Sequence, residues 1–112
     1  MKSPQRLGHL VEVFQGNQPL VEGLVALFLD HTPQLLAELL MLVREGRINE
    51  FHGVAFRLKS NLRVLGFPEI RNQVEAIGVS LRAGKTASEL EPALNALELS
   101  LLEACHQLSA SH

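Results

Sequence analysis

Residues 48–65 carry the pattern that most constrains how this chain can fold. Apolar side chains recur there at alternating spacings of three and four, at Ile48, Phe51, Ala55, Leu58, Leu62 and Leu65. This spacing turns one face of an α-helix toward a protein core. No segment of the chain alternates between apolar and polar residues, as a half-buried strand would. The sequence therefore predicts an all-α protein.

Glycine and proline mark where these helices begin and end. We expect a short N-terminal helix over residues 3–14, a second helix over about 19–44, a third over about 50–66, a fourth from about 67 to 82, and a last one from Ser88 to about 108. Short connections between long helices favour antiparallel neighbours. The predicted fold is an antiparallel four-helix bundle with a short N-terminal helix, in a single domain over residues 1–112.

Several finer features follow from the same pattern. Pro33 should kink the second helix or open it locally near residues 30–33. Apolar residues nearly encircle that helix, with one side formed by Leu20, Leu24, Leu27, Phe28, Leu35, Leu39 and Leu42, and a second by Val21, Val25, Leu29, Leu36, Leu40 and Val43. The inward residues of the fourth helix should be Ile70, Val74, Ile77 and Leu81, and those of the last helix Leu90, Leu94, Leu97, Leu101 and Leu108. Ser88 and Glu91 have the spacing of a capping box, and Leu99 and Leu102 lie off the core stripe.

Composition excludes several classes of protein. Ten basic and twelve acidic residues give a formal charge of −2, which argues against a nucleic-acid-binding protein. The single cysteine, Cys105, forms no intrachain disulfide, and the five histidines lack metal-ligand spacing. No phosphate-binding glycine loop is present. No secretion signal or good membrane span is expected, because charged residues and a proline interrupt residues 20–43. A cytoplasmic protein without cofactor, metal or catalytic machinery is the prediction.

A second stripe on the third helix needs an explanation of its own. His52, Phe56, Lys59 and Arg63 repeat at helical spacing on a side away from the apolar face. At about 100° per residue, Phe56 points well away from the centre of the core face. An aromatic ring among basic residues, off the core face, suggests contact with something outside the bundle.

The third helix resembles the central helix of the histidine phosphotransfer (HPt) family of bacterial phosphorelays. That family reads approximately Ala-His-x-Leu-Lys-Gly followed by Leu-Gly, and residues 55–60 here read Ala-Phe-Arg-Leu-Lys-Ser, followed by Leu65 and Gly66. Residues 28–39 are similar to the family's preceding helix, and the resemblance covers roughly residues 6–81. It implies a four-helix bundle that docks a response-regulator receiver domain or a histidine kinase.

The chain departs from the family at the residue that carries the chemistry. Phe56 stands where the resemblance places the phosphorylated histidine, and a phenyl ring has no lone pair with which to accept a phosphoryl group. Lys59 is kept, and Ser60 replaces the family's small glycine. The resemblance therefore implies a degenerate, phosphotransfer-incompetent member that docks its partner through His52, Gly53, Phe56, Lys59, Ser60 and Arg63, with Lys59 and Arg63 meeting the partner's acidic pocket.

Other interpretations remain open from the sequence. His52, one turn before Phe56, is a rival phosphoacceptor, although it lacks the Lys–Gly pair, or it is an exposed polar residue that helps to bind a partner. Phe56 could instead pack against a neighbouring helix or a second subunit. A helical self-association module, forming a homodimer unrelated to signalling, would use the apolar second helix together with Leu99 and Leu102.

Overall fold

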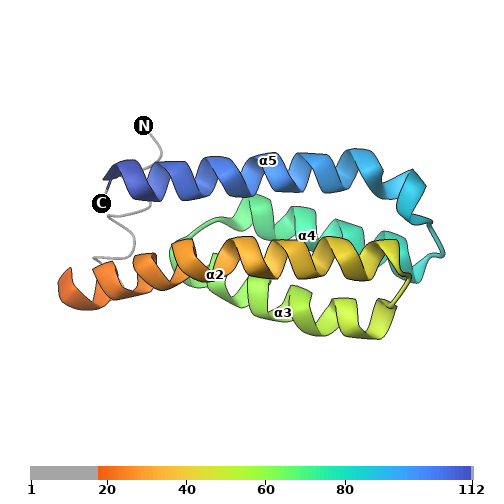
Figure 1. Cartoon of the computed structure of the whole chain (residues 1–112), viewed down its shortest axis with the longest axis horizontal. Coiled ribbons are helices and arrows are strands. Elements are labelled where there is room, and N and C mark those ends of the chain that lie inside the picture. Colours follow the sequence, from red (N-terminus) through yellow and green to blue (C-terminus); the bar gives the residue numbers. More distant parts are fainter. Residues whose placement is uncertain (1–17, 112) are drawn as a thin grey trace.

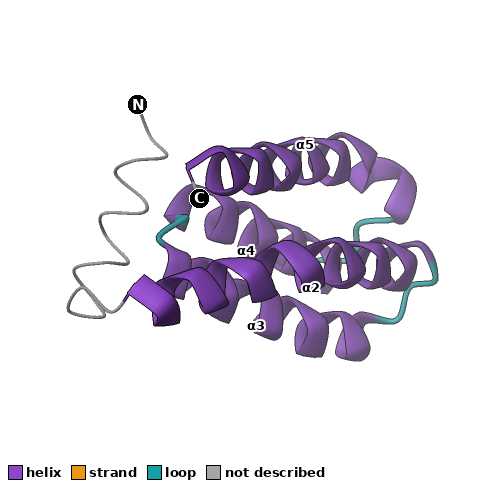
Figure 2. Ribbon diagram, turned by 60° about the vertical axis from the view of Figure 1, so that its left-hand side comes forward, coloured by secondary structure: helices purple, strands orange, loops and turns teal. Residues whose placement is uncertain are grey.

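The computed structural model describes residues 18–111, which form four α-helices and no strand. Helix α2 spans Gln18–Arg44, α3 spans Ile48–Leu65, α4 spans Pro68–Arg82 and α5 spans Ala87–Ser111. The helices lie side by side along the long axis of the molecule (Figure 1) and are joined by short loops (Figure 2). The all-α prediction is confirmed for these residues, and the predicted helix at residues 3–14 lies outside them.

The helices pack around one apolar core. Helix α3 contacts α2 and α4, and α5 contacts α4 and α2, so that each helix has two neighbours. The predicted inward residues of α4 and α5 are all buried. The buried apolar residues of the core are Val21, Val25, Phe28, Leu36, Leu39, Leu42, Val43, Phe51, Val54, Ala55, Leu58, Leu62, Leu65, Phe67, Ile70, Val74, Ile77, Leu81, Leu90, Leu94, Leu97, Leu101, Ala104 and Leu108.

The predicted core of α3 needs one correction. Ile48, placed on the inner stripe from its spacing, is 36% exposed, whereas Val54, which the stripe omitted, is buried. Ile48 is the first residue of α3, where a side chain has no preceding helical turn beside it. Val54 is buried because α3 packs against two helices, which widens its buried sector beyond a single stripe.

The apolar surface of helix α2 is larger than the area that the other described helices cover. Leu20 and Leu27 are exposed, while Val21, Val25 and Phe28 are buried. Residues 30–33 stay helical through Pro33, so the expected local opening is absent and a kink there stays a prediction. By length and composition the stretch Pro19–Arg44 could also cross a membrane, contrary to the expectation from its charged residues and proline. A core helix passes the same test, and this helix has a buried face.

Helices α2, α3 and α4 end in the same pattern of backbone hydrogen bonds at their C-termini. At the end of α3, the backbone N–H of Phe67 donates to the carbonyl of Leu62 (2.9 Å) and that of Gly66 to the carbonyl of Arg63 (3.3 Å). These two bonds form a Schellman motif, which needs a left-handed residue, and Gly66 has φ of 81°. The same pair of bonds closes α2 at Gly46 and α4 at Gly84. The predicted helix stops are therefore confirmed.

The cap of α5 lies two residues before the predicted one. The helix begins at Ala87 and its cap is Thr86 rather than Ser88. The backbone N–H of Glu89 donates to Thr86 Oγ1 (3.2 Å), and the backbone N–H of Thr86 donates to Glu89 Oε1 (2.8 Å). This is a reciprocal capping box. The bond from the Thr86 backbone holds the pKa of the Glu89 carboxyl below its usual value.

Replacing Thr86 with alanine should destabilise the protein by about 1 kcal/mol, because the N–H of Glu89 loses its acceptor. Ser88→Ala is the matched control, since Ser88 already lies inside the first turn of α5. Urea unfolding of the two variants beside the wild type measures the difference. An equal loss for both variants would contradict the assignment of Thr86 as the cap.

Candidate functional site

Phe56 stands on the surface of α3 with 67% of its area exposed. The prediction that it points away from the core is confirmed, and its packing against a neighbouring helix within the described chain is ruled out. A shallow depression lies on each side of it: the α3–α4 depression of about 310 Å³ and the α2–α3 depression of about 470 Å³. Ser60, one turn further along α3, lines both depressions with Phe56. Phe56 therefore forms a ridge between two grooves.

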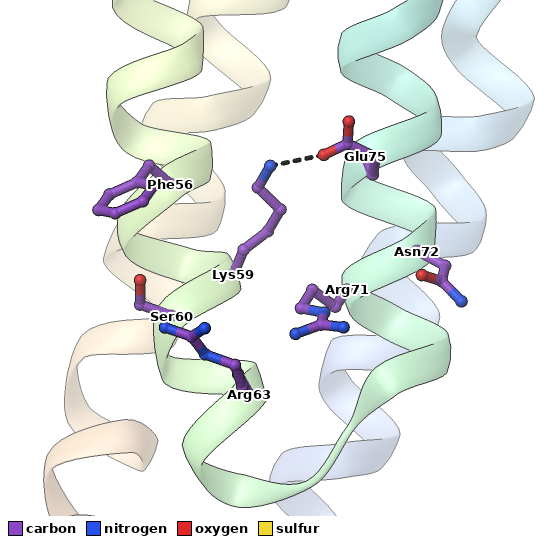
Figure 3. A pocket seen from close by; sticks show the side chains of 7 residues that line it. All are labelled: Phe56, Lys59, Ser60, Arg63, Arg71, Asn72 and Glu75. Carbon is purple, nitrogen blue, oxygen red and sulfur yellow. Dashed lines mark hydrogen bonds and ion pairs between the residues drawn. The ribbon is translucent and has the colours of Figure 1, made fainter.

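The α3–α4 depression is lined by polar and charged residues from two helices: Phe56, Lys59, Ser60, Arg63, Arg71, Asn72 and Glu75. Figure 3 shows these side chains, with Lys59 extending from α3 toward Glu75 on α4. Lys59 Nζ donates to Glu75 Oε1 at 2.6 Å, and the other carboxylate oxygen lies 3.9 Å from Arg82. The bond from Lys59 lowers the pKa of Glu75. Lys59, predicted to meet a partner's acidic pocket, is already engaged within the protein.

Two arginines in this depression have no such partner. Arg63 extends from α3 and Arg71 from α4 on the same side of the molecule (Figure 3). Among the residues that the structure describes, neither guanidinium forms an ion pair. Arg63 was predicted to be a docking residue, and Arg71 was not.

His52 lies deeper than the sequence suggested. It was considered as an exposed polar residue, but it is half-buried between α3 and α4, and a Cβ added to Gly78 would lie 3.3 Å from its Cε1. Arg82 Nη1 lies 3.4 Å from His52 Nε2. A guanidinium only donates, so this contact requires an unprotonated Nε2. Burial, followed by the positive charges of Arg82 and Lys59, lowers the pKa of His52.

The α2–α3 depression is the more neutral of the two. It is lined by His31, Gln34, Leu35, Glu38, Phe56, Arg57, Ser60 and Asn61. Its arginine and its glutamate form an ion pair with each other, with Arg57 Nη2 3.8 Å from Glu38 Oε1. The charge that could attract a partner is therefore concentrated on the α3–α4 side of Phe56.

The predicted docking residues do not form one uniform surface. Gly53, Phe56 and Arg63 are exposed, whereas His52, Lys59 and Ser60 are half-buried. Phe56, Lys59, Ser60 and Arg63 line a common depression, from which His52 and Gly53 are absent. The residues that sequence reasoning missed are Arg71, Asn72 and Glu75, all on α4.

Phe56 offers no nucleophile. No group of three or more His, Cys, Asp or Glu that could hold a metal ion occurs within residues 18–111. Cys105 is half-buried, and burial raises the pKa of its thiol, so that it is a poor nucleophile.

Comparison of the chain with family models, with curated proteins and with solved structures gave no match. The geometry of the surface around Phe56 therefore carries the functional argument.

The pKa of His52 should be measurable as lower than that of an ordinary histidine by NMR titration of its ring protons. Arg82→Gln should raise it, because one neighbouring positive charge is removed. A folded-state pKa below the unfolded value of about 6.5 means that the unfolded chain binds more protons as the pH falls.

The contribution of His52 to stability is thus fully present above that unfolded value and is lost as the pH falls through the folded one. His52→Gln should weaken the loss of stability in this window, as measured by urea unfolding at successive pH values. Parallel stability curves for wild type and variant would contradict this.

Proposed function

We propose that this protein is an HPt-like docking protein that binds a two-component signalling partner in the cytoplasm without passing phosphate. The partner would be a response-regulator receiver domain or a histidine kinase, and the protein would regulate the phosphorelay by occupying its docking surface. The observation that supports this most directly is Phe56, which is 67% exposed at the position where the resemblance expects the phosphoacceptor.

The proposal includes the finer arrangement of the fold. We infer an antiparallel four-helix bundle over one domain, preceded by a short N-terminal helix. The connections contain three residues between α2 and α3, two between α3 and α4, and four between α4 and α5. Such short links favour antiparallel neighbours, and the cyclic order of helix contacts fits a bundle.

The exposure of Phe56 supports a role in binding. Burying a phenylalanine side chain stabilises it by roughly 1.5–3 kcal/mol relative to leaving it in water, so Phe56 forgoes that stabilisation in the isolated chain. Aromatic residues in the middle of an interface often dominate its energy. Depressions on both sides of the ring would receive ridges of a partner, and basic residues at its α4 side would face acidic groups of a receiver domain.

Replacing Phe56 with alanine should weaken binding to a cognate receiver domain at least about tenfold, which corresponds to about 1.4 kcal/mol. The matched control is Leu99→Ala, because Leu99 is 68% exposed on α5, away from this surface. Calorimetric titration of receiver domains from neighbouring genes measures both variants. Unchanged affinity for Phe56→Ala would remove Phe56 from the interface.

The wild-type protein should take no acid-labile phosphate from a phosphorylated receiver domain, whereas Phe56→His should become labelled, because an imidazole would then stand beside Lys59. His52 is the alternative acceptor, favoured by one observation: Arg82 lies against its Nε2 and would offset phosphate charge. Wild-type labelling that disappears in His52→Ala would replace the proposed function with phosphotransfer through His52.

Self-association is the second candidate function. Leu99 and Leu102 are 68% and 58% exposed on the same helix, and three residues apart they share a face. A dimer formed through α5 would leave Phe56 accessible and is compatible with docking. If Leu99→Ala shifted the protein from dimer to monomer on a sizing column while no receiver domain bound, self-association would be the function.

A further inference from the structure

The two-residue turn between α3 and α4 sets residues at equal distance from Phe67 opposite each other. Lys59 and Glu75 are each eight residues from Phe67, and their side chains form the 2.6 Å ion pair. His52 and Arg82 are each fifteen residues away, and they are in contact at 3.4 Å. The pair at four residues is Arg63 and Arg71. The two helices therefore place two positive charges, Arg63 and Arg71, opposite each other in sequence register. The next pair, Lys59 and Glu75, has opposite charges.

This arginine pair is not neutralised within the described part of the chain. Both side chains line the α3–α4 depression, and Figure 3 shows them below the Lys59–Glu75 pair, with Arg63 beside Ser60 on α3 and Arg71 on α4. Glu75 is the only acidic residue among those that line the depression. Its oxygens already contact Lys59 and Arg82. Two guanidinium groups that line one depression without a counter-charge have the chemistry to bind an oxyanion.

We propose that Arg63 and Arg71 together bind a side-chain carboxylate of the protein partner, while Phe56 contacts an apolar residue beside that carboxylate. This inference rests on the proposed function, because the carboxylate belongs to the partner named there. In this arrangement the acidic group of the partner contacts Arg71 on α4 instead of Lys59, because Lys59 is already paired with Glu75. The partner is thus recognised by an acidic residue next to an apolar one.

The charge of the depression suits an anion, and the proposed function supplies a carboxylate of a protein partner as that anion. Its lining residues comprise three cations (Lys59, Arg63 and Arg71) and one anion (Glu75), a net charge of +2. When one carboxylate is bound, the depression keeps a net charge of +1. A carboxylate can also accept two parallel hydrogen bonds from one guanidinium. A phosphate dianion would be repelled more strongly by the Glu75 carboxylate but also attracted more strongly by the three cations, so the choice of a carboxylate follows from the protein partner of the proposed function.

The test uses the folded protein and a defined probe, the blocked tripeptide acetyl-Leu-Asp-Leu-amide. Its binding is followed through the Nε–Hε NMR signals of the arginine side chains at low salt. The signals of Arg63 and Arg71 should shift saturably, and the signal of Arg57, which Glu38 engages, should not. The same peptide with Asn in place of Asp should bind at least about tenfold more weakly, since the charge-assisted bonds are lost.

Arg71→Gln should abolish the saturable shift at Arg63, and Arg57→Gln is the matched control that should preserve it. Equal, non-saturating shifts at all arginines would overturn the proposal, because they indicate only the general ionic atmosphere. Tighter binding of inorganic phosphate than of the acidic peptide would overturn the choice of a carboxylate. Tighter binding of the Asn peptide would overturn the site altogether.

A stability measurement separates the binding role from a structural one. If Arg63 and Arg71 repel each other, Arg71→Glu should raise the melting temperature at low salt, because it converts the pair into one like Lys59–Glu75. A lower melting temperature would show that Arg71 holds the fold together, and this would overturn the proposal. The peptide test does not depend on a receiver domain, so saturable peptide binding without receiver binding rejects the proposed function and keeps the site.

Discussion

The turn at Gly66 and Phe67 is the constraint on which the proposed docking surface depends. Its left-handed glycine lets the chain reverse within two residues, and the buried Phe67 ring stacks on Phe28 of α2 with a centroid distance of 6.2 Å. The turn is therefore fixed by the backbone hydrogen bonds of Gly66 and Phe67 and by the packing of the Phe67 ring in the core. Because it is so short and so firmly held, α3 and α4 can meet in one register only, and that register decides which charges face each other.

The register of α3 against α4 produces three different electrostatic environments along the contact between these helices. Near the loops at residues 45–47 and 83–86, His52 meets Arg82, and burial together with this positive charge lowers the pKa of His52. In the middle, Lys59 and Glu75 neutralise each other across the helices. Near the turn, Arg63 and Arg71 remain uncompensated among the described residues. A surface pair such as Lys59–Glu75 contributes little to stability. Its effect is to confine the available positive charge to the end of this contact nearest the turn.

Much of the fold could be predicted because helical periodicity and glycine stops are local signals. The stops at Gly46, Gly66 and Gly84 and the inward faces of α4 and α5 follow from spacing alone. The capping box was misplaced because Ser88/Glu91 and Thr86/Glu89 have the same spacing, and only the backbone bonds distinguish them. Arg71, Asn72 and Glu75 were missed because a family frame on α3 carries no information about α4. Counting outward from Phe67 would have found Arg71 and Glu75.

The surroundings of Phe56 on the two neighbouring helices distinguish it from other exposed apolar residues. On α3 alone it is an exposed ring, and Leu99 on α5 is equally exposed. The difference is that Phe56 stands between two depressions with charged walls, so that a partner covering it would also enclose polar groups at fixed positions. An apolar contact supplies affinity without direction, whereas the paired guanidinium groups restrict where an acidic residue can sit. Specificity at this surface would therefore come from the Arg63 and Arg71 pair on α3 and α4, and affinity from Phe56 on α3.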